Sequence, residues 1–192
     1  MSQKDTPLSV SLRTLKSRSP ALVLSPPLTI GLALIAQLSK VSCLIQLCCA
    51  YIYKKLGNVC YDFMTNNIKG DSTSASSREL MLWLQYEGGQ LPIGWGKGPS
   101  ATIDDLFGTS WELYEDVNTD TGITVSSMLP TTQFEGSFSG DLKDWLLALV
   151  ALGKFTEDTY VNVGNAGTEF FYGNAIMNAT LALQIDIKST SH

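Results

Sequence analysis

The chain contains a single histidine, His192, and only four cysteines, all of them within its first 60 residues. No spacing among Cys43, Cys48, Cys49 and Cys60 matches a Cys/His metal site, so we expect no metal centre of that kind. The sequence also lacks a glycine-rich phosphate loop ahead of a predicted helix, so nucleotide or redox chemistry is not expected. We therefore expect neither a metal nor a cofactor.

Positive charge is scarce in the larger part of the chain. Residues 56–192 contain 6 Lys/Arg against 17 Asp/Glu, a net of −11, whereas residues 1–55 contain 7 against 1, a net of +6. Binding to a nucleic-acid backbone needs clustered Lys and Arg side chains. The acidic part therefore argues against a nucleic-acid partner and favours a neutral, sugar-like ligand.

Residues 1–55 have the composition of a basic leader followed by an apolar segment. Residues 1–27 are rich in Ser, Pro and basic residues, and residues 28–53 are apolar except for a few positions that include Lys40. The length suits a membrane span of ~20 residues, but a lysine near the centre costs roughly 3 kcal/mol on insertion. The segment is a secretory signal, a membrane anchor, or a buried or wrongly assigned piece of chain. In each case we expect residues 1–53 to contribute no strand to the domain at residues 56–192.

From residue 56 onward, alternating apolar residues predict short antiparallel strands. In residues 58–64 the alternation puts Val59, Tyr61 and Phe63 on one face and Asn58, Cys60, Asp62 and Met64 on the other. In residues 78–86 it separates Leu80, Leu82, Leu84 and Tyr86 from Glu79, Met81, Trp83 and Gln85. Further strands are expected at residues 108–116, 122–130, 159–173 and 178–188. The pattern predicts an all-β domain with the acids on polar faces.

One helix is predicted near residues 140–152. Its apolar residues recur at helical spacing and include Leu142, Trp145 and Leu149. Ser139 is suited to be the N-cap and Gly153 to end the helix. This apolar stripe predicts core packing rather than a binding site.

Two glutamates, Glu79 and Glu169, lie 90 residues apart on strand-like runs and each shares a face with aromatic residues. Glycoside hydrolysis needs two carboxyl groups that converge on one cleft, one to protonate the leaving oxygen and one to attack or to activate water. Gly167, two residues before Glu169, leaves room for a ligand near the backbone. An exposed glutamate at a sheet edge is the alternative interpretation of each position.

Four motifs in residues 57–192 resemble the C-terminal two-thirds of glycoside hydrolase family 12, the endo-β-1,4-glucanases and xyloglucanases of fungi and oomycetes. The motifs are NVCYDFM, RELMLWL followed by LPIG, FSGDLKDWL, and AGTEFFYG. The resemblance implies a jelly-roll sandwich of two antiparallel sheets with one helix, and a mechanism that retains anomeric configuration. It further implies that Glu79 is the nucleophile, Glu169 the general acid/base and Asp62 an aspartate that hydrogen-bonds near the nucleophile, while Met81, Trp83 and Phe171 line the sugar subsites.

The chain also departs from the family. Arg78 stands where the family tends to have Tyr, and residues 170–172 differ from the usual Pro and Thr. Nothing upstream of Lys54 resembles the family's first strands, so we expect a partial jelly roll at residues 56–192 with weak activity or none.

Two functions follow from these observations. One is a retaining endo-hydrolase of β-1,4-glucans such as cellulose, β-glucan or xyloglucan. The other is an inactive relative that binds carbohydrate or acts as a decoy for a proteinaceous glucanase inhibitor. A polymeric substrate and the sequon at Asn178 predict a secreted protein, with anchoring through residues 28–53 as the alternative.

Overall fold

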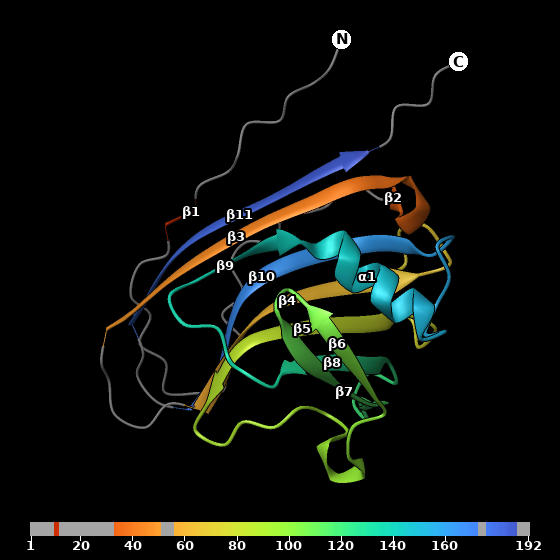
Figure 1. Cartoon of the computed structure of the whole chain (residues 1–192). Helices are drawn as coiled ribbons and strands as arrows, with labels where there is room; N and C mark the ends of the chain where they lie inside the picture. Colours follow the sequence, from red (N-terminus) through yellow and green to blue (C-terminus); the bar gives the residue numbers. More distant parts are fainter. Residues whose placement is uncertain (1–9, 12–32, 51–55, 173–175, 188–192) are drawn as a thin grey trace.

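A computed structural model describes the backbone of residues 10–11, 33–50, 56–172 and 176–187, and the side chains of residues 34–38, 41 and 57–169. Its strands form two sheets, with the orders β1-β11-β3-β9 and β2-β10-β4-β5-β8-β7-β6 (Figure 1). The strands are β1 Val10–Ser11, β2 Ala33–Leu34, β3 Leu38–Ala50, β4 Leu56–Asn66, β5 Arg78–Glu87, β6 Ala101–Leu106, β7 Thr109–Val117, β8 Thr124–Pro130, β9 Ser137–Asp141, β10 Tyr160–Tyr172 and β11 Ile176–Ile187. Within these residues there is one α-helix, α1 Leu142–Ala151, and the predicted all-β fold with one helix is confirmed. Neighbouring strands are antiparallel except β5 and β8, which are parallel.

The expectation that residues 1–53 contribute no strand is wrong. Strand β3 pairs with β11 from Leu38 to Ala50 and with β9 on its other side, and the short strands β1 and β2 pair with β11 and β10. Apolar residues follow one another in this segment instead of alternating, a pattern that buried strands share with membrane segments. In the described parts of the chain, no helix is both long and apolar enough to span a membrane.

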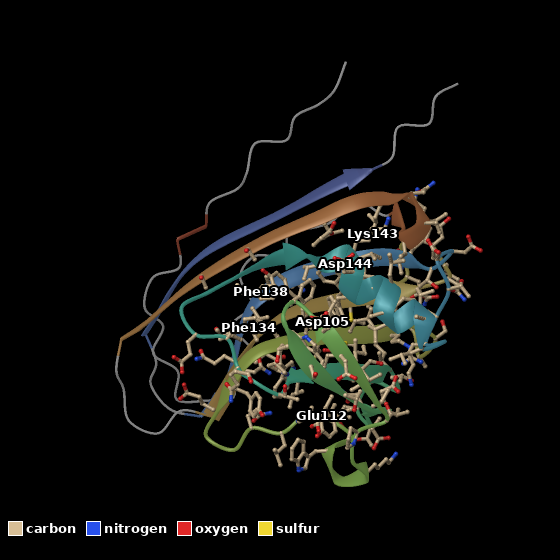
Figure 2. The ribbon with its side chains drawn as sticks, viewed as in Figure 1. Asp105, Glu112, Phe134, Phe138, Lys143 and Asp144 are labelled. Carbon is tan, nitrogen blue, oxygen red and sulfur yellow. The ribbon has the colours of Figure 1, made fainter. Side chains whose placement is uncertain are left out.

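The main core lies between the inner face of the seven-stranded sheet and a cover formed by β3, β9 and α1. Leu80, Leu82 and Leu84 of β5 are fully buried there, as the alternation predicts. Phe63 of β4 packs against Trp145 of α1 with ring centroids 5.3 Å apart. Phe138 of β9 and Phe134, which precedes that strand, are labelled in Figure 2, and their rings meet edge to face with centroids 4.9 Å apart. This packing fixes β4 and β5 from one side and leaves their other face for a site.

Helix α1 begins directly after β9, a strand of the four-stranded sheet. Its N-cap is Asp141, not the predicted Ser139, because Asp141 Oδ1 accepts hydrogen bonds from the backbone N–H of Lys143 at 3.1 Å and of Val41 at 2.7 Å. Ser139 instead belongs to β9. Gly153, with φ of 69°, follows the helix end as predicted.

The loop at residues 88–100 is held against β7 through one glycine. Gly94 has φ of 90°, and a Cβ added there would lie 2.6 Å from the backbone oxygen of Glu115. Next to it, the Trp95 ring stacks on Tyr114 at 4.8 Å, and Lys97 pairs with Asp116 at 2.7 Å. Only glycine satisfies both the backbone conformation and the close approach.

We predict that Gly94→Ala lowers the free energy of unfolding by about 1–3 kcal/mol, since the backbone of β7 cannot move aside. Gly96→Ala, two residues along the same loop, is the control because a Cβ there has no atom within 4 Å. Urea unfolding of the two variants measures the difference. Equal stabilities would show that the close approach at Gly94 does not constrain the loop.

Candidate active site

The outer face of the seven-stranded sheet brings the three predicted acids together. Asp62 on β4 lies directly opposite Asn165 of β10 and Met81 of β5. Glu169 lies opposite Asn58, and Glu79 lies opposite Met64. Residues directly opposite one another share a face, and alternate residues of a strand do too. Glu79, Asp62 and Glu169 therefore lie on one face, turned away from the core leucines.

Burial raises the pKa of all three acids, and the charges of neighbouring carboxyls add to the rise at Asp62 and Glu79. The pKa of Asp62 is raised well above its usual value by burial and then by the charges of Glu79 and Glu169. Burial and the charge of Glu169 raise the pKa of Glu79. Burial also raises the pKa of Glu169, although a hydrogen bond from Asn58 opposes the rise. A cluster of this kind holds a proton at pH values where ordinary carboxyls are ionised, as a general acid requires.

Asn58 is a site residue that the sequence pattern placed on the right face without a role. Its Nδ2 donates a hydrogen bond of 2.7 Å to Glu169 Oε2, and its side chain is almost fully buried. An amide donor at this position orients the Glu169 carboxyl and leaves its other oxygen for a reacting group. The signal that could have found it is the alternation that sets Asn58 four residues from Asp62 on the same face.

Several buried polar atoms on this face have no hydrogen-bond partner among the described residues. They are Asn58 Oδ1, Asp62 Oδ1, Asn165 Oδ1, Trp83 Nε1 and Ser127 Oγ. Ser127 belongs to the face because it lies opposite Met81 on β8. Each unsatisfied buried group costs about 1–3 kcal/mol, so this face carries an unusual number of polar groups for a packed sheet. No group of three or more His, Cys, Asp or Glu among the described side chains has metal-binding geometry.

Met81 and Trp83 lie on the predicted face but are 5% and 2% exposed. They pack in a second apolar cluster with Cys60, Tyr114, Val125 and Leu129. Their contact with sugar stays a prediction. Phe171 lies on β10, but its side chain is outside the part that the structure describes.

Tyr86 lies on the outer face, whereas strict alternation had put it with the core leucines. The pairing of β4 with β5 shifts between Val59 and Cys60, whose partners are Gln85 and Trp83. This irregularity at Leu84 turns the following residues over. The Tyr86 ring consequently lies 5.9 Å from that of Trp83.

The raised pKa of Asp62 predicts how stability changes with pH. The folded protein retains this proton to higher pH than the unfolded chain, whose Asp titrates near pH ~4, so the contribution of Asp62 to stability is greatest below that pH and declines above it. We expect Asp62→Asn to raise Tm at pH 7 by a few degrees and to change it little near pH ~3. Thermal unfolding across this pH range measures the effect.

Asp116→Asn is the matched control because a hydrogen bond from Lys97 and another from the backbone N–H of Val117 lower the pKa of Asp116. The sign is reversed there, and this variant should lose stability at pH 7. If Asp62→Asn behaved like Asp116→Asn, the repulsive cluster would be disproved.

Comparisons with known proteins identify a family for the chain. The model of glycosyl hydrolase family 12 matches residues 32–187. Xyloglucan-specific endo-beta-1,4-glucanase A of Aspergillus aculeatus is 35% identical over 120 residues, which are 62% of this chain and 47% of that protein. Its namesake from Emericella nidulans is 36% identical over 129 residues, 67% and 49% of the two chains. The chain thus spans about half the length of the curated relatives it matches.

Solved structures show the same fold. A cellulase derived from Cel12A of Rhodothermus marinus superposes with a TM-score of 0.73 at 24% identity, over 90% of this chain and 79% of the other. The catalytic domain of Humicola grisea Cel12A, in complex with a soaked thio cellotetraose, gives 0.68 at 21% identity, over 97% and 83%.

Proposed function

Because the chain belongs to glycosyl hydrolase family 12, we propose that it is a retaining endo-hydrolase of β-1,4-glucans. The observation that carries the proposal is the cluster of Glu79, Asp62 and Glu169 on one face, each with a raised pKa. Two carboxyls with these properties are what a double-displacement glycosidase uses.

In the first step Glu169 donates its proton to the glycosidic oxygen while a carboxylate oxygen of Glu79 attacks the anomeric carbon. The bond from that carbon to the leaving oxygen breaks as the ester to Glu79 forms. In the second step the ionised Glu169 takes a proton from water, whose oxygen displaces Glu79 and restores both carboxyls. This two-step mechanism requires a separation of about 5–5.5 Å between the carboxyl groups of Glu79 and Glu169.

Asp62 supports the nucleophile in this scheme. Burial and the charges of Glu79 and Glu169 raise its pKa well above the usual value, so it retains a proton to higher pH than an ordinary aspartate. A protonated Asp62 can donate a hydrogen bond to Glu79. That bond stabilises the ionised form of Glu79 before the ester forms.

Xyloglucan is the first substrate to test, since the relatives from Aspergillus aculeatus and Emericella nidulans are named for it. Asn58, Asn165 and Ser127 share the face of the three acids, and a polar face suits a ligand rich in hydroxyl groups. A polymer of this kind lies outside cells, so the proposal includes secretion of the protein.

The proposal is tested with variants of the two glutamates in the 192-residue chain. Glu79→Gln should abolish release of reducing ends from xyloglucan, barley β-glucan and carboxymethylcellulose, because no nucleophile remains. Glu169→Gln should lower kcat by about 10²–10⁴-fold on these polymers and less on aryl glycosides, whose leaving group needs little protonation. Added azide should then accelerate turnover by Glu169→Gln alone.

A wild-type chain that binds xyloglucan but hydrolyses none of the three polymers would contradict the enzyme and support a carbohydrate-binding decoy. Full activity of Glu79→Gln would contradict the assignment of the nucleophile.

A further inference from the structure

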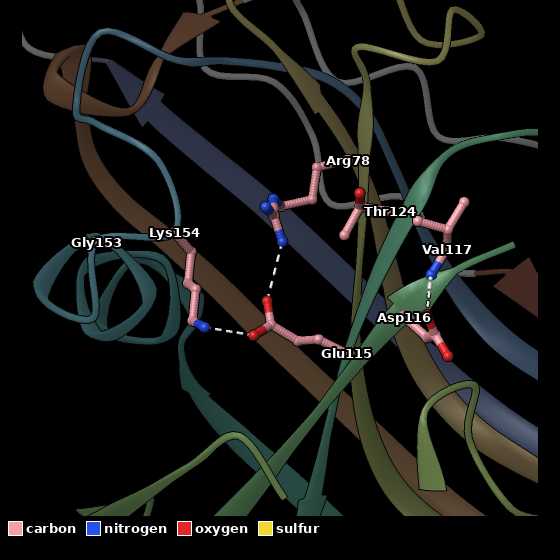
Figure 3. Close-up of a pocket in the computed structure, with 7 residues that line it drawn as sticks. All are labelled: Arg78, Glu115, Asp116, Val117, Thr124, Gly153 and Lys154. Carbon is pink, nitrogen blue, oxygen red and sulfur yellow. Dashed lines mark hydrogen bonds and ion pairs between the residues drawn. The ribbon is translucent and has the colours of Figure 1, made fainter. Parts of the chain in front are cut away.

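Arg78 directly precedes Glu79 on β5, but its side chain points to the opposite face of the sheet. There it lines a cavity of about 310 Å³ between the ends of β5, β7 and β8 and the end of α1 (Figure 3). Glu115 of β7 and Lys154, just after the helix, line the same cavity. A charged side chain on the core-facing side of a strand needs a partner of opposite charge, and Glu115 is that partner.

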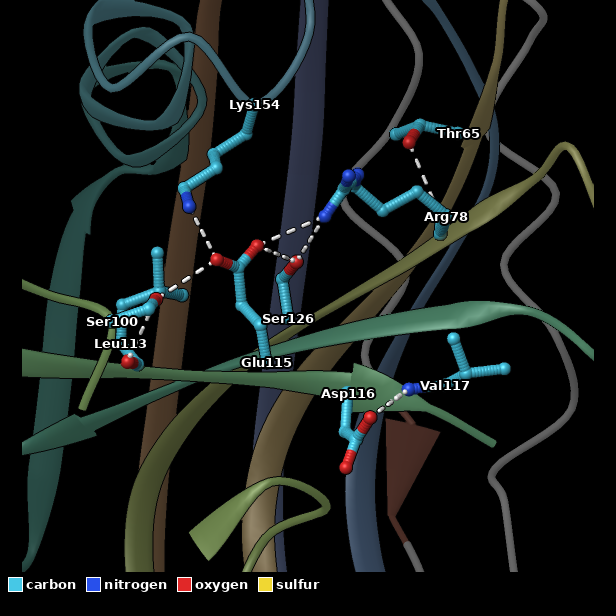
Figure 4. Close-up of polar contacts among 9 residues, drawn as sticks. All are labelled: Thr65, Arg78, Ser100, Leu113, Glu115, Asp116, Val117, Ser126 and Lys154. Atoms are coloured by element: carbon cyan, nitrogen blue, oxygen red, sulfur yellow. Dashed lines mark hydrogen bonds and ion pairs between the residues drawn. The ribbon is translucent and has the colours of Figure 1, made fainter. Parts of the chain in front are cut away.

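Glu115 is the centre of a polar network that joins separate parts of the chain (Figure 4). Its Oε1 accepts hydrogen bonds from Arg78 Nη1 at 3.0 Å and from Ser126 Oγ at 2.9 Å. Its Oε2 accepts one from Ser100 Oγ at 2.8 Å and a short one from Lys154 Nζ. Arg78 Nη1 also donates to Ser126 Oγ at 2.7 Å. One carboxylate therefore ties β5, β7 and β8 to the loop before β6 and to the end of the helix.

The network is partly buried and charged. The side chains of Arg78, Glu115 and Lys154 are 25%, 15% and 21% exposed. Burial raises the pKa of Glu115, but hydrogen bonds from Lys154, Ser100 and Ser126 outweigh it, and the net shift is downward. Charge-assisted hydrogen bonds in such a setting are shorter and stronger than neutral ones, and removal of one partner leaves the other charge uncompensated.

The start of β5 needs this support because of what precedes it. Residues 67–77 are mostly polar and form turns, and Arg78 and Glu79 are the first two residues of the strand. The ends of a strand open more readily than its middle. Besides its side-chain bonds, the Arg78 carbonyl accepts a hydrogen bond of 3.2 Å from Thr65 Oγ1. Arg78 is thus held on both sides, by β4 and by β7 with β8.

We propose that Arg78 and Glu115 act as positioning residues that fix the start of β5 and thereby the carboxylate of Glu79. The inference rests on the proposed function, since it concerns the residue that attacks the sugar. Arg78 and Glu115 do not face the substrate. Their effect passes through the backbone of one residue, and a misplacement of about 1 Å at a reacting group can lower a rate by ~10²-fold.

Arg78 and Lys154, the two cations that line the cavity, are both bound by Glu115. The network is therefore a contact between parts of the fold and not an anion-binding site. Asp116, which also lines the cavity, is engaged by Lys97.

The test measures kcat and KM for xyloglucan with the full chain carrying Arg78→Met, Glu115→Gln, or both. Each single variant should lower kcat by about tenfold with little change in KM, since sugar binding is intact and only the attack is misaligned. The double variant should be no slower than the slower single variant, because the two residues act as one unit. Arg78→Lys keeps the charge and should recover most of the lost kcat.

Lys97→Met is the matched control, since it removes the exposed ion pair with Asp116 and should leave kcat unchanged. Unchanged kcat in folded Arg78→Met and Glu115→Gln would overturn the inference, as would a rise in KM with kcat intact. If either variant fails to fold, Ser126→Ala removes a smaller part of the network and should still lower kcat without changing KM. An inactive wild-type chain would contradict both the proposed function and this inference. If the wild type is active and Glu79→Gln is inactive, the proposed function holds, and unchanged kcat in the Arg78 and Glu115 variants then contradicts this inference alone.

Discussion

The repulsion among three half-buried carboxyl groups is the constraint on which the rest of the structure depends. Burial raises the pKa of Asp62, Glu79 and Glu169, the charges of Glu79 and Glu169 raise that of Asp62 further, and the charge of Glu169 raises that of Glu79. Loops would relax such a cluster by moving apart. Here the three acids lie on neighbouring central strands, where the register of β10, β4 and β5 holds them together.

The same strands show what opposes the repulsion. Tyr61 and Phe63 of β4, and Leu80 and Leu82 of β5, are fully or almost fully buried on the core side. A shift that separated the acids would move these side chains out of the main core, and a register slip of one residue would turn each of them to the wrong face. Core packing on one face thus stabilises an unfavourable electrostatic arrangement on the other, as is common at functional sites.

Sequence alone predicted the parts of this fold that depend on local alternation. The faces of β4 and β5, the position of α1 and the common face of the acids follow from period-2 and helical spacing. Strand β3 was missed because its consecutive apolar residues resemble a membrane segment, and Tyr86 was misplaced because one irregularity in pairing reverses the alternation. The N-cap was assigned two residues too early because Ser139 and Asp141 are both good caps; the hydrogen bonds that Asp141 accepts from Lys143 and Val41, and the place of Ser139 within β9, distinguish them.

Other features were beyond the reach of sequence patterns because they depend on pairing between distant strands. The parallel pairing of β5 with β8 brings Ser126 to Arg78, and the neighbouring strand β7 brings Glu115. Likewise, the bond from Asn58 to Glu169 spans 111 residues and follows from the register of β4 with β10. Neither contact leaves a local signal in the sequence.

The most direct test of the account is the site of the covalent bond to sugar. A 2-fluoro glycoside with a good leaving group slows the second step more than the first, so the glycosyl ester accumulates on the nucleophile. Trypsin cleaves after Arg78 and Lys97, and mass spectrometry of the digest should show the added sugar on the peptide of residues 79–97. The Glu79→Gln chain should show no adduct. An adduct on any other peptide, or hydrolysis without an adduct on residues 79–97, would contradict the assignment of Glu79.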